Sequence, residues 1–136
     1  MKTALAIIAP LALLAACATV PEAEDIEIEA SAEDLIGNWD VSLFFSPDEA
    51  PSKTMMVVEA VDDGVLSGTF YGSPFFAARA IVNDDEVLFT AVTEDNSGRY
   101  IHSGELEDGE IEGTTFAVGR DFLMAWEAEP MEGEPQ

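Results

Sequence analysis

The sequence predicts an all-β fold, an eight-stranded antiparallel up-and-down barrel, on the basis of three observations. Between about residues 35 and 128, apolar and polar residues alternate with a period of two, as in strands with one buried face. Short breaks rich in Asp, Asn and Gly separate the apolar runs, which is typical of tight hairpin turns. None of these breaks is long enough for a helical crossover, so neighbouring strands are expected to pair antiparallel.

Eight runs are the candidate strands. In chain order they are LIGNWDVSLFF (35–45), KTMMVVEAV (53–61), VLSGTFY (65–71), FFAARAIV (75–82), EVLFTAVT (86–93), RYIHSGEL (99–106), EIEGTTFAV (110–118) and DFLMAWEA (121–128). The breaks with turn chemistry are Asp62-Asp63-Gly64, Gly72-Ser73-Pro74, Asn83-Asp84-Asp85, Asp95-Asn96-Ser97-Gly98 and Asp108-Gly109. A flat sheet of eight strands would leave two open edges, and closure into a barrel removes them.

The predicted interior mixes large and small side chains. The large ones are Trp39, Phe89, Phe122 and Trp126, and the small ones are Gly37, Gly68, Gly104 and Gly113. The glycines either leave room for a ligand or simply let the strands coil. An eight-stranded barrel is about the size that side chains fill, or that holds one small ligand. Because the strands are short, we expect a mostly filled barrel that binds in a shallow mouth or on a partner surface.

Two short motifs resemble known barrel families. Gly37-Asn38-Trp39 resembles the G-x-W near the first strand of lipocalins and other calycins. Along the chain, this motif is followed by Gly68-Thr69-Phe70-Tyr71 and then by the late Trp126. This order of motifs is similar to that of the avidin-type barrel. The resemblance implies a calycin-like barrel with Trp39 at one end. It also implies that Arg120 matches the late lipocalin Arg that packs on this Trp, and that the barrel could carry a small apolar ligand.

The N-terminal segment has the layout of a secretory signal. Lys2 precedes an apolar run, residues 4–16, that is shorter than the roughly 20 residues of a transmembrane helix. Leu14-Ala15-Ala16-Cys17 resembles the lipobox of bacterial lipoproteins, and it contains the only cysteine of the chain. The resemblance implies cleavage before Cys17, acylation of Cys17, and anchoring in a membrane. Ala18, in place of Asp, further implies the periplasmic face of the outer membrane rather than the inner membrane.

Acidic residues greatly outnumber basic ones in this chain. The chain has 5 basic and 28 acidic residues and a net charge of −23. Nucleic acid is an unsuitable partner, because phosphate binding needs a basic patch. Such a charge suits solubility or a salty medium that screens self-repulsion.

The charge pattern also divides the chain. Residues 1–16 are the expected signal peptide, and 17–34 the lipidated Cys17 with a disordered acidic tether. The barrel takes residues 35–128, and a disordered acidic tail takes 129–136. In an alternative interpretation, the alternating DIEIEA (25–30) forms a short edge strand.

The sequence lacks a recognisable catalytic or metal-binding motif. His102 is the only histidine, and Ser103 next to it points to the opposite face of a strand. We therefore predict a non-enzymatic protein without a cofactor or a metal. Residues that could instead contact a ligand, or close an end of the barrel, are Trp39, Arg79, Tyr100, His102, Arg120 and Trp126. If Arg79 points inward, it is the best candidate for orienting an anionic ligand or for a barrel-end pairing with Trp39.

Together these patterns predict a periplasmic lipoprotein, held at the outer membrane through Cys17, with a small barrel as a binding or structural module. The expected partner is an envelope protein or a small apolar ligand. A carrier that holds the apolar ligand inside the barrel is the alternative, and an enzyme is the third choice.

Overall fold

The computed structural model describes residues 29–132 of the chain. The expected signal peptide, Cys17, most of the acidic segment and the last four residues of the tail lie outside the described residues. Of the alternative edge strand (25–30), only residues 29 and 30 are described, and they are not in a strand. Neither of the two helical segments in residues 29–132 is long and apolar enough to cross a membrane.

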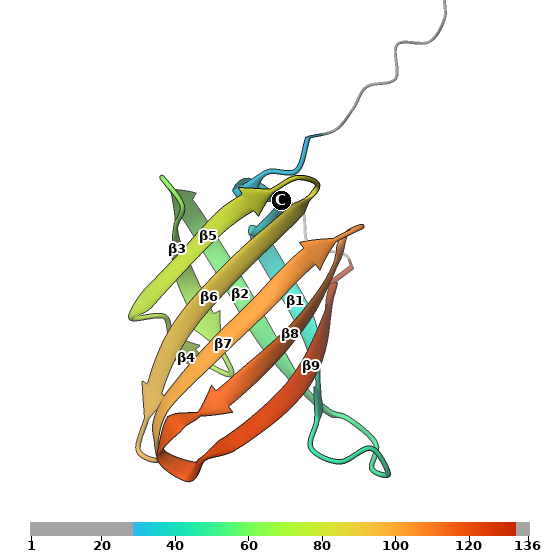
Figure 1. Ribbon diagram of the computed structural model, residues 1–136, viewed down its shortest axis with the longest axis vertical. Coiled ribbons are helices and arrows are strands. Elements are labelled where there is room, and N and C mark those ends of the chain that lie inside the picture. Colours follow the sequence, from blue (N-terminus) through green and yellow to red (C-terminus); the bar gives the residue numbers. More distant parts are fainter. Residues whose placement is uncertain (1–28, 133–136) are drawn as a thin grey trace, which may run out of the picture.

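The described chain forms a closed antiparallel barrel (Figure 1). Its strands are β1 (Gly37–Phe44), β2 (Ser52–Asp62), β3 (Val65–Phe70), β4 (Ser73–Pro74), β5 (Ala77–Asn83), β6 (Glu86–Asp95), β7 (Gly98–Glu107), β8 (Glu110–Ala117) and β9 (Phe122–Pro130). They pair in the order β2-β1-β9-β8-β7-β6-β5-β3-β4, and pairing of β2 with β3 closes the barrel. Apart from the two-residue β4, these are the eight strands that the sequence predicts, so the fold class is confirmed.

Three boundaries differ from the expected ones. A 3₁₀ helix, η1 (Ala32–Leu35), occupies the end of the segment expected to be a disordered tether. The Ser31 side chain accepts from the backbone N–H of Glu33, and Asp34 accepts from the backbone N–H of Ser31, which caps this turn. β9 continues to Pro130, two residues into the expected tail, because Glu129 and Pro130 still pair with β1. β4 lies where a turn was expected, since Ser73 pairs with Phe70.

Tight turns at one end of the barrel follow the chemistry read from the sequence. Asp63-Gly64 and Asp108-Gly109 each place two residues at positive φ, between 48° and 82°. This is the conformation of a type I′ hairpin turn, in which Gly carries no steric penalty. Asp84 has the same left-handed backbone in the turn between β5 and β6.

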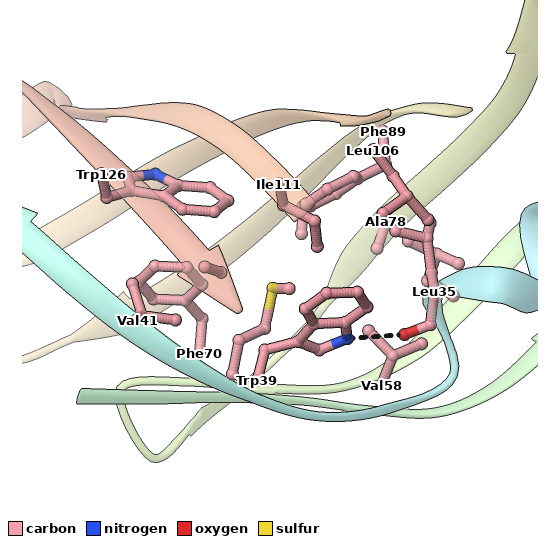
Figure 2. Close-up of a cluster of buried hydrophobic side chains, with 14 of the residues drawn as sticks. Leu35, Trp39, Val41, Val58, Phe70, Ala78, Phe89, Leu106, Ile111 and Trp126 are labelled. Atoms are coloured by element: carbon pink, nitrogen blue, oxygen red, sulfur yellow. Dashed lines mark hydrogen bonds between the residues drawn. The ribbon is translucent and has the colours of Figure 1, made fainter. Parts of the chain in front are cut away.

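The 3₁₀ helix η1 plugs this same end of the barrel. Leu35 is completely buried, and the Trp39 Nε1 donates a hydrogen bond of 2.9 Å to its carbonyl oxygen (Figure 2). Val58 and Leu106 are buried in the same core. Both ends of the described chain lie at this end, whereas the turn between β6 and β7 lies at the other (Figure 1).

Large rings fill the middle of the barrel. A Cβ placed on Gly104 would lie 2.6 Å from the Phe89 ring, and one placed on Gly113 would lie 2.2 Å from the Trp126 ring. The two glycines pair with each other on β7 and β8, so together they make room for the two rings. Figure 2 shows the Trp126 and Phe89 side chains among the buried apolar groups. Gly104 and Gly113 therefore accommodate aromatic side chains, and these rings fill the barrel at this level.

Candidate functional site

A cavity opens at the end of the barrel opposite η1, and we call it the mouth pocket. Its volume is about 340 Å³, at the lower end of the range for small-molecule sites. Its lining residues are Leu43, Phe45, Phe70, Tyr71, Ser73, Thr93, Asp95, Ser97, Tyr100, His102, Thr115, Ala117, Arg120, Phe122 and Met124. They form two unlike walls: β1 and β9 bring mainly apolar side chains, and β6, β7, β8 and the 3₁₀ turn η2 (Val118–Arg120) bring mainly polar ones.

His102 forms the buried part of the polar wall. Its Nε2 is 2.9 Å from the Thr93 hydroxyl on β6, and its Nδ1 is 2.7 Å from the Thr115 hydroxyl on β8. All three side chains are buried. The imidazole thus joins three neighbouring strands, and both of its nitrogen atoms are satisfied, as buried polar groups require. These contacts fix the plane of the ring.

Burial lowers the pKa of His102 to about 4, because the cationic ring would lose its hydration. The imidazole is therefore neutral near pH 7. A neutral ring held between two threonine hydroxyls is a weak base and suits a fixed polar floor for the mouth pocket better than proton transfer.

Four side chains continue the polar wall to the rim as one chain of hydrogen bonds. Arg120 donates from Nη2 to the Tyr100 hydroxyl oxygen at 2.8 Å. Ser97 donates its single hydroxyl hydrogen to Asp95 Oδ1 at 2.6 Å, so the Tyr100 hydroxyl, which also contacts the Ser97 oxygen, donates to it. The bonds from Ser97, and then the charge of Arg120, lower the pKa of Asp95. A cation and an anion are thus linked through two hydroxyl groups.

Stacked rings support Arg120 from below. The Phe70 and His102 rings are nearly parallel, with centroids 4.0 Å apart. Tyr100 is nearly parallel to His102 at 6.4 Å, and the Arg120 guanidinium carbon lies 5.7 Å from the centre of the Tyr100 ring. The stack runs from the buried floor to the rim, where the guanidinium gains a favourable contact with the ring face.

The opposite wall is apolar. Phe45 and Phe122 are stacked at the rim, with centroids 6.2 Å apart, and both are partly exposed. Leu43 and Met124 are buried below them. A molecule in the mouth pocket would therefore meet aromatic and aliphatic surface on one side and hydrogen-bonding groups on the other.

The structure brings three of the six predicted site residues together, namely Tyr100, His102 and Arg120. Trp126 is buried in the middle of the barrel, where its Nε1 has no hydrogen-bond partner within residues 29–132. Trp39 lies at the plugged end, away from the mouth pocket.

The structure overturns the implied contact of Arg120 with Trp39, and it does not meet the condition set for Arg79, an inward side chain. Arg120 stacks on Tyr100 at the mouth instead of packing on Trp39, because η2 (Val118–Arg120) lies at the opposite end of the barrel. Arg79 is exposed on the outer wall, because Ala78 and Ala80 take the inward positions of β5, and it donates to the Asp63 carbonyl oxygen at 3.4 Å. Arg79 therefore contacts neither Trp39 nor the mouth pocket.

Thr93, Thr115, Asp95 and Ser97 are functional candidates that sequence reasoning missed. Thr93 continues the inward alternation of Val87, Phe89 and Ala91, so the period of two was a usable signal for it. Asp95 accepts from both the backbone N–H and the hydroxyl of Ser97, an Asx turn that the sequence Asp-Asn-Ser-Gly indicates. These four residues form the polar wall together with Tyr100, His102 and Arg120.

Carboxylates also gather on the outer wall. Glu86, Glu105 and Glu107 each bring a ligand oxygen within 4.8 Å of the others. Glu112 lies directly between Glu105 and Glu127 in the register of β7, β8 and β9. Neighbouring like charges of this kind are expected in so acidic a chain and do not by themselves indicate a metal site.

Comparisons with known proteins give no relative to extend these observations. The chain matches no protein-family model, no curated protein and no solved structure.

Proposed function

We propose that this protein is a non-enzymatic binding module that takes a small molecule in the mouth pocket. The observation that carries the proposal is the pair of unlike walls around a cavity of about 340 Å³. Small-molecule sites are typically concave and mostly apolar, with a few fixed polar groups that orient the ligand. His102, Tyr100 and Arg120 are such groups, since hydrogen bonds and stacked rings hold each of them in place.

Side chains fill the middle and the plugged end of the barrel. This packing favours a ligand bound at the mouth over a ligand enclosed deep inside. The Phe89 and Trp126 rings occupy the middle level, and Leu35 and Trp39 occupy the plugged end. A ligand would thus be held near the rim, with one side open to solvent. This favours a receptor or sensor of a small molecule over a carrier that encloses an apolar one.

The module is proposed to be anchored through Cys17 to the periplasmic face of the outer membrane. Support comes from the lipobox-like Leu14-Ala15-Ala16-Cys17 and from the apolar run before it. Because residue 29 enters at the plugged end, the mouth would lie at the far end of the domain from its tether (Figure 1). Cys17→Ser should abolish palmitate labelling and release the protein from membrane fractions. Unchanged labelling and fractionation would contradict the anchor.

Binding is tested by native mass spectrometry of the protein purified from the cells that produce it. We expect a stoichiometric small molecule, and we expect Ala117→Phe, which places a ring in the mouth pocket, to remove it. Thr114→Phe, on the exposed face of the same strand, is the matched control and should retain the ligand. A bound molecule that survives Ala117→Phe, or no bound molecule at any salt concentration, would contradict the proposal.

A further inference from the structure

We propose that the ligand of the mouth pocket is a small amphiphile with an anionic head group that Arg120 binds. This inference rests on the proposed function and narrows it to a chemical class. Its starting point is the state of the Arg120 guanidinium, which is exposed at the rim and has no carboxylate within 4 Å in residues 29–132. Of the other basic side chains in this part of the chain, Lys53 and Arg99 each pair with a carboxylate, whereas Arg79, like Arg120, does not.

Arg120 is held in place while keeping donors to spare. It uses Nη2 for the Tyr100 hydroxyl, and its other N–H groups have no acceptor in the described part of the chain. A guanidinium has five N–H donors in a planar fork that matches a carboxylate or a sulfonate. Contact with the Tyr100 ring limits its freedom, and the ring below, His102, is itself fixed by two threonines. Less ordering is then needed when an anion binds.

Arg120 is also the cation of the mouth pocket, because His102 is neutral near pH 7 and no other basic residue of 29–132 lines the cavity. The negative charge at the rim is that of Asp95, whose Oδ1 accepts two hydrogen bonds from Ser97. The hydroxyls of Ser97 and Tyr100 link this carboxylate to Arg120, so it positions the guanidinium indirectly. An anionic head group could therefore take the open side of the guanidinium.

The apolar wall of the mouth pocket indicates that the rest of the ligand, apart from its head group, is apolar. Phe45, Phe122, Leu43 and Met124 offer aromatic and aliphatic surface. A flat apolar group can stack there while its head group faces Arg120. The cavity of about 340 Å³ has room for a bicyclic ring system, and the filled layer below keeps a long chain from entering the barrel.

The test compares two probes with the same ring system and nearly the same shape, the anion 2-naphthoate and its neutral analogue 2-naphthamide. Equilibrium dialysis of the full chain against each radiolabelled probe gives two dissociation constants. We expect 2-naphthoate to bind about tenfold more tightly, since hydrogen bonds that involve ionised groups are about twice as strong as neutral ones. Arg120→Gln should remove that preference and leave 2-naphthamide binding unchanged.

Matched variants separate the effect of the Arg120 side chain at the mouth pocket from the effect of changing the net charge of the chain. Arg79→Gln makes the same change of charge on the outer wall and should retain the preference. Tyr100→Phe removes the hydroxyl that holds Arg120 and should reduce the preference by a few-fold. Asp95→Asn should bind 2-naphthoate at least as tightly as the parent chain.

Each outcome has a distinct meaning. Equal affinity for both probes, with both lost in Ala117→Phe, would overturn the anionic class and leave the proposed binding function standing. Weaker binding in Asp95→Asn, together with tighter binding of 2-naphthylmethylamine than of 2-naphthoate, would overturn it in favour of a cationic ligand. Failure of every probe to bind at millimolar concentration would overturn the inference, whereas the native-mass result tests the binding function independently of these probes.

Discussion

The indole of Trp126 lies directly over the Cα of Gly113, close enough that a methyl group there would be 2.2 Å from Cζ2 of the ring. This ring is rigid and packed among other buried rings, so it cannot swing away. We expect Gly113→Ala to lower the free energy of unfolding by about 1–3 kcal/mol, the usual cost of overpacking a core. Urea denaturation measures this, with Thr114→Ala on the exposed face as the control, expected within about 0.5 kcal/mol. A Gly113→Ala protein as stable as its parent would mean that this level is not filled.

The two tryptophans should respond differently to the same substitution. Both are buried, but Trp39 donates to the Leu35 carbonyl oxygen, whereas the Trp126 Nε1 has no partner in the described chain. Trp39→Phe would leave that oxygen unpaired, and Trp126→Phe would remove an unsatisfied donor. We therefore expect Trp39→Phe to destabilise the fold by about 1–2 kcal/mol more than Trp126→Phe does. Equal losses in urea denaturation would contradict the assigned hydrogen bonding.

Acid should weaken the fold through His102. Its folded pKa of about 4 lies below the ordinary value of 6.5, so the unfolded chain binds a proton at pH values where the folded chain does not. Stability is thus lost as the pH falls from about 6.5 to 4, and by linkage about 2 kcal/mol of it is lost between pH 7 and pH 5. His102→Gln does not titrate and should lack this loss, while the many carboxylates affect both proteins alike. Parallel pH dependences for the two proteins would show that the imidazole is not buried.

The outer wall gives a prediction about salt. Glu112 is paired in register with Glu105 on one side and Glu127 on the other, and like charges directly opposite are destabilising. We expect Glu112→Lys to raise the free energy of unfolding by about 0.5–1 kcal/mol at low salt, and much less at 1 M salt, where screening is strong. Glu49→Lys, in the loop between β1 and β2, makes the same change of charge away from these strands. An equal gain in both variants would assign the effect to net charge instead.

Much of the fold could be predicted from the sequence because its signals are local. Period-two alternation marks the inward residues of the first, fifth and last predicted strands, although not those of β5, and Asp-Gly pairs mark where the chain reverses. Trp39 and Trp126 inside the barrel follow from that alternation. The structured turn at Ser31 was missed, although Ser31 and Asp34 carry a capping pattern, because the surrounding charge favoured disorder.

The candidate site was only partly predictable because it depends on contacts between distant strands. Tyr100 and His102 could be identified from their shared inward face, but their partners Thr93, Thr115 and Arg120 come from other strands and connections. The resemblance to lipocalins placed Arg120 at the wrong end of the barrel. Register decides such pairings, and it is fixed by the whole ladder rather than by any short motif.

We propose that the open end of the barrel binds small molecules and that the filled remainder does not. Methyl-resolved NMR of the full chain titrated with 2-naphthamide or 2-naphthoate tests it most directly. The account predicts shifts of the Leu43, Ala117 and Met124 methyl groups, which line the mouth pocket, and none of Leu35 or Val58 at the plugged end. Shifts centred on Leu35 and Val58, or on exposed groups of the outer wall such as Ile81, with the mouth unaffected, would contradict it.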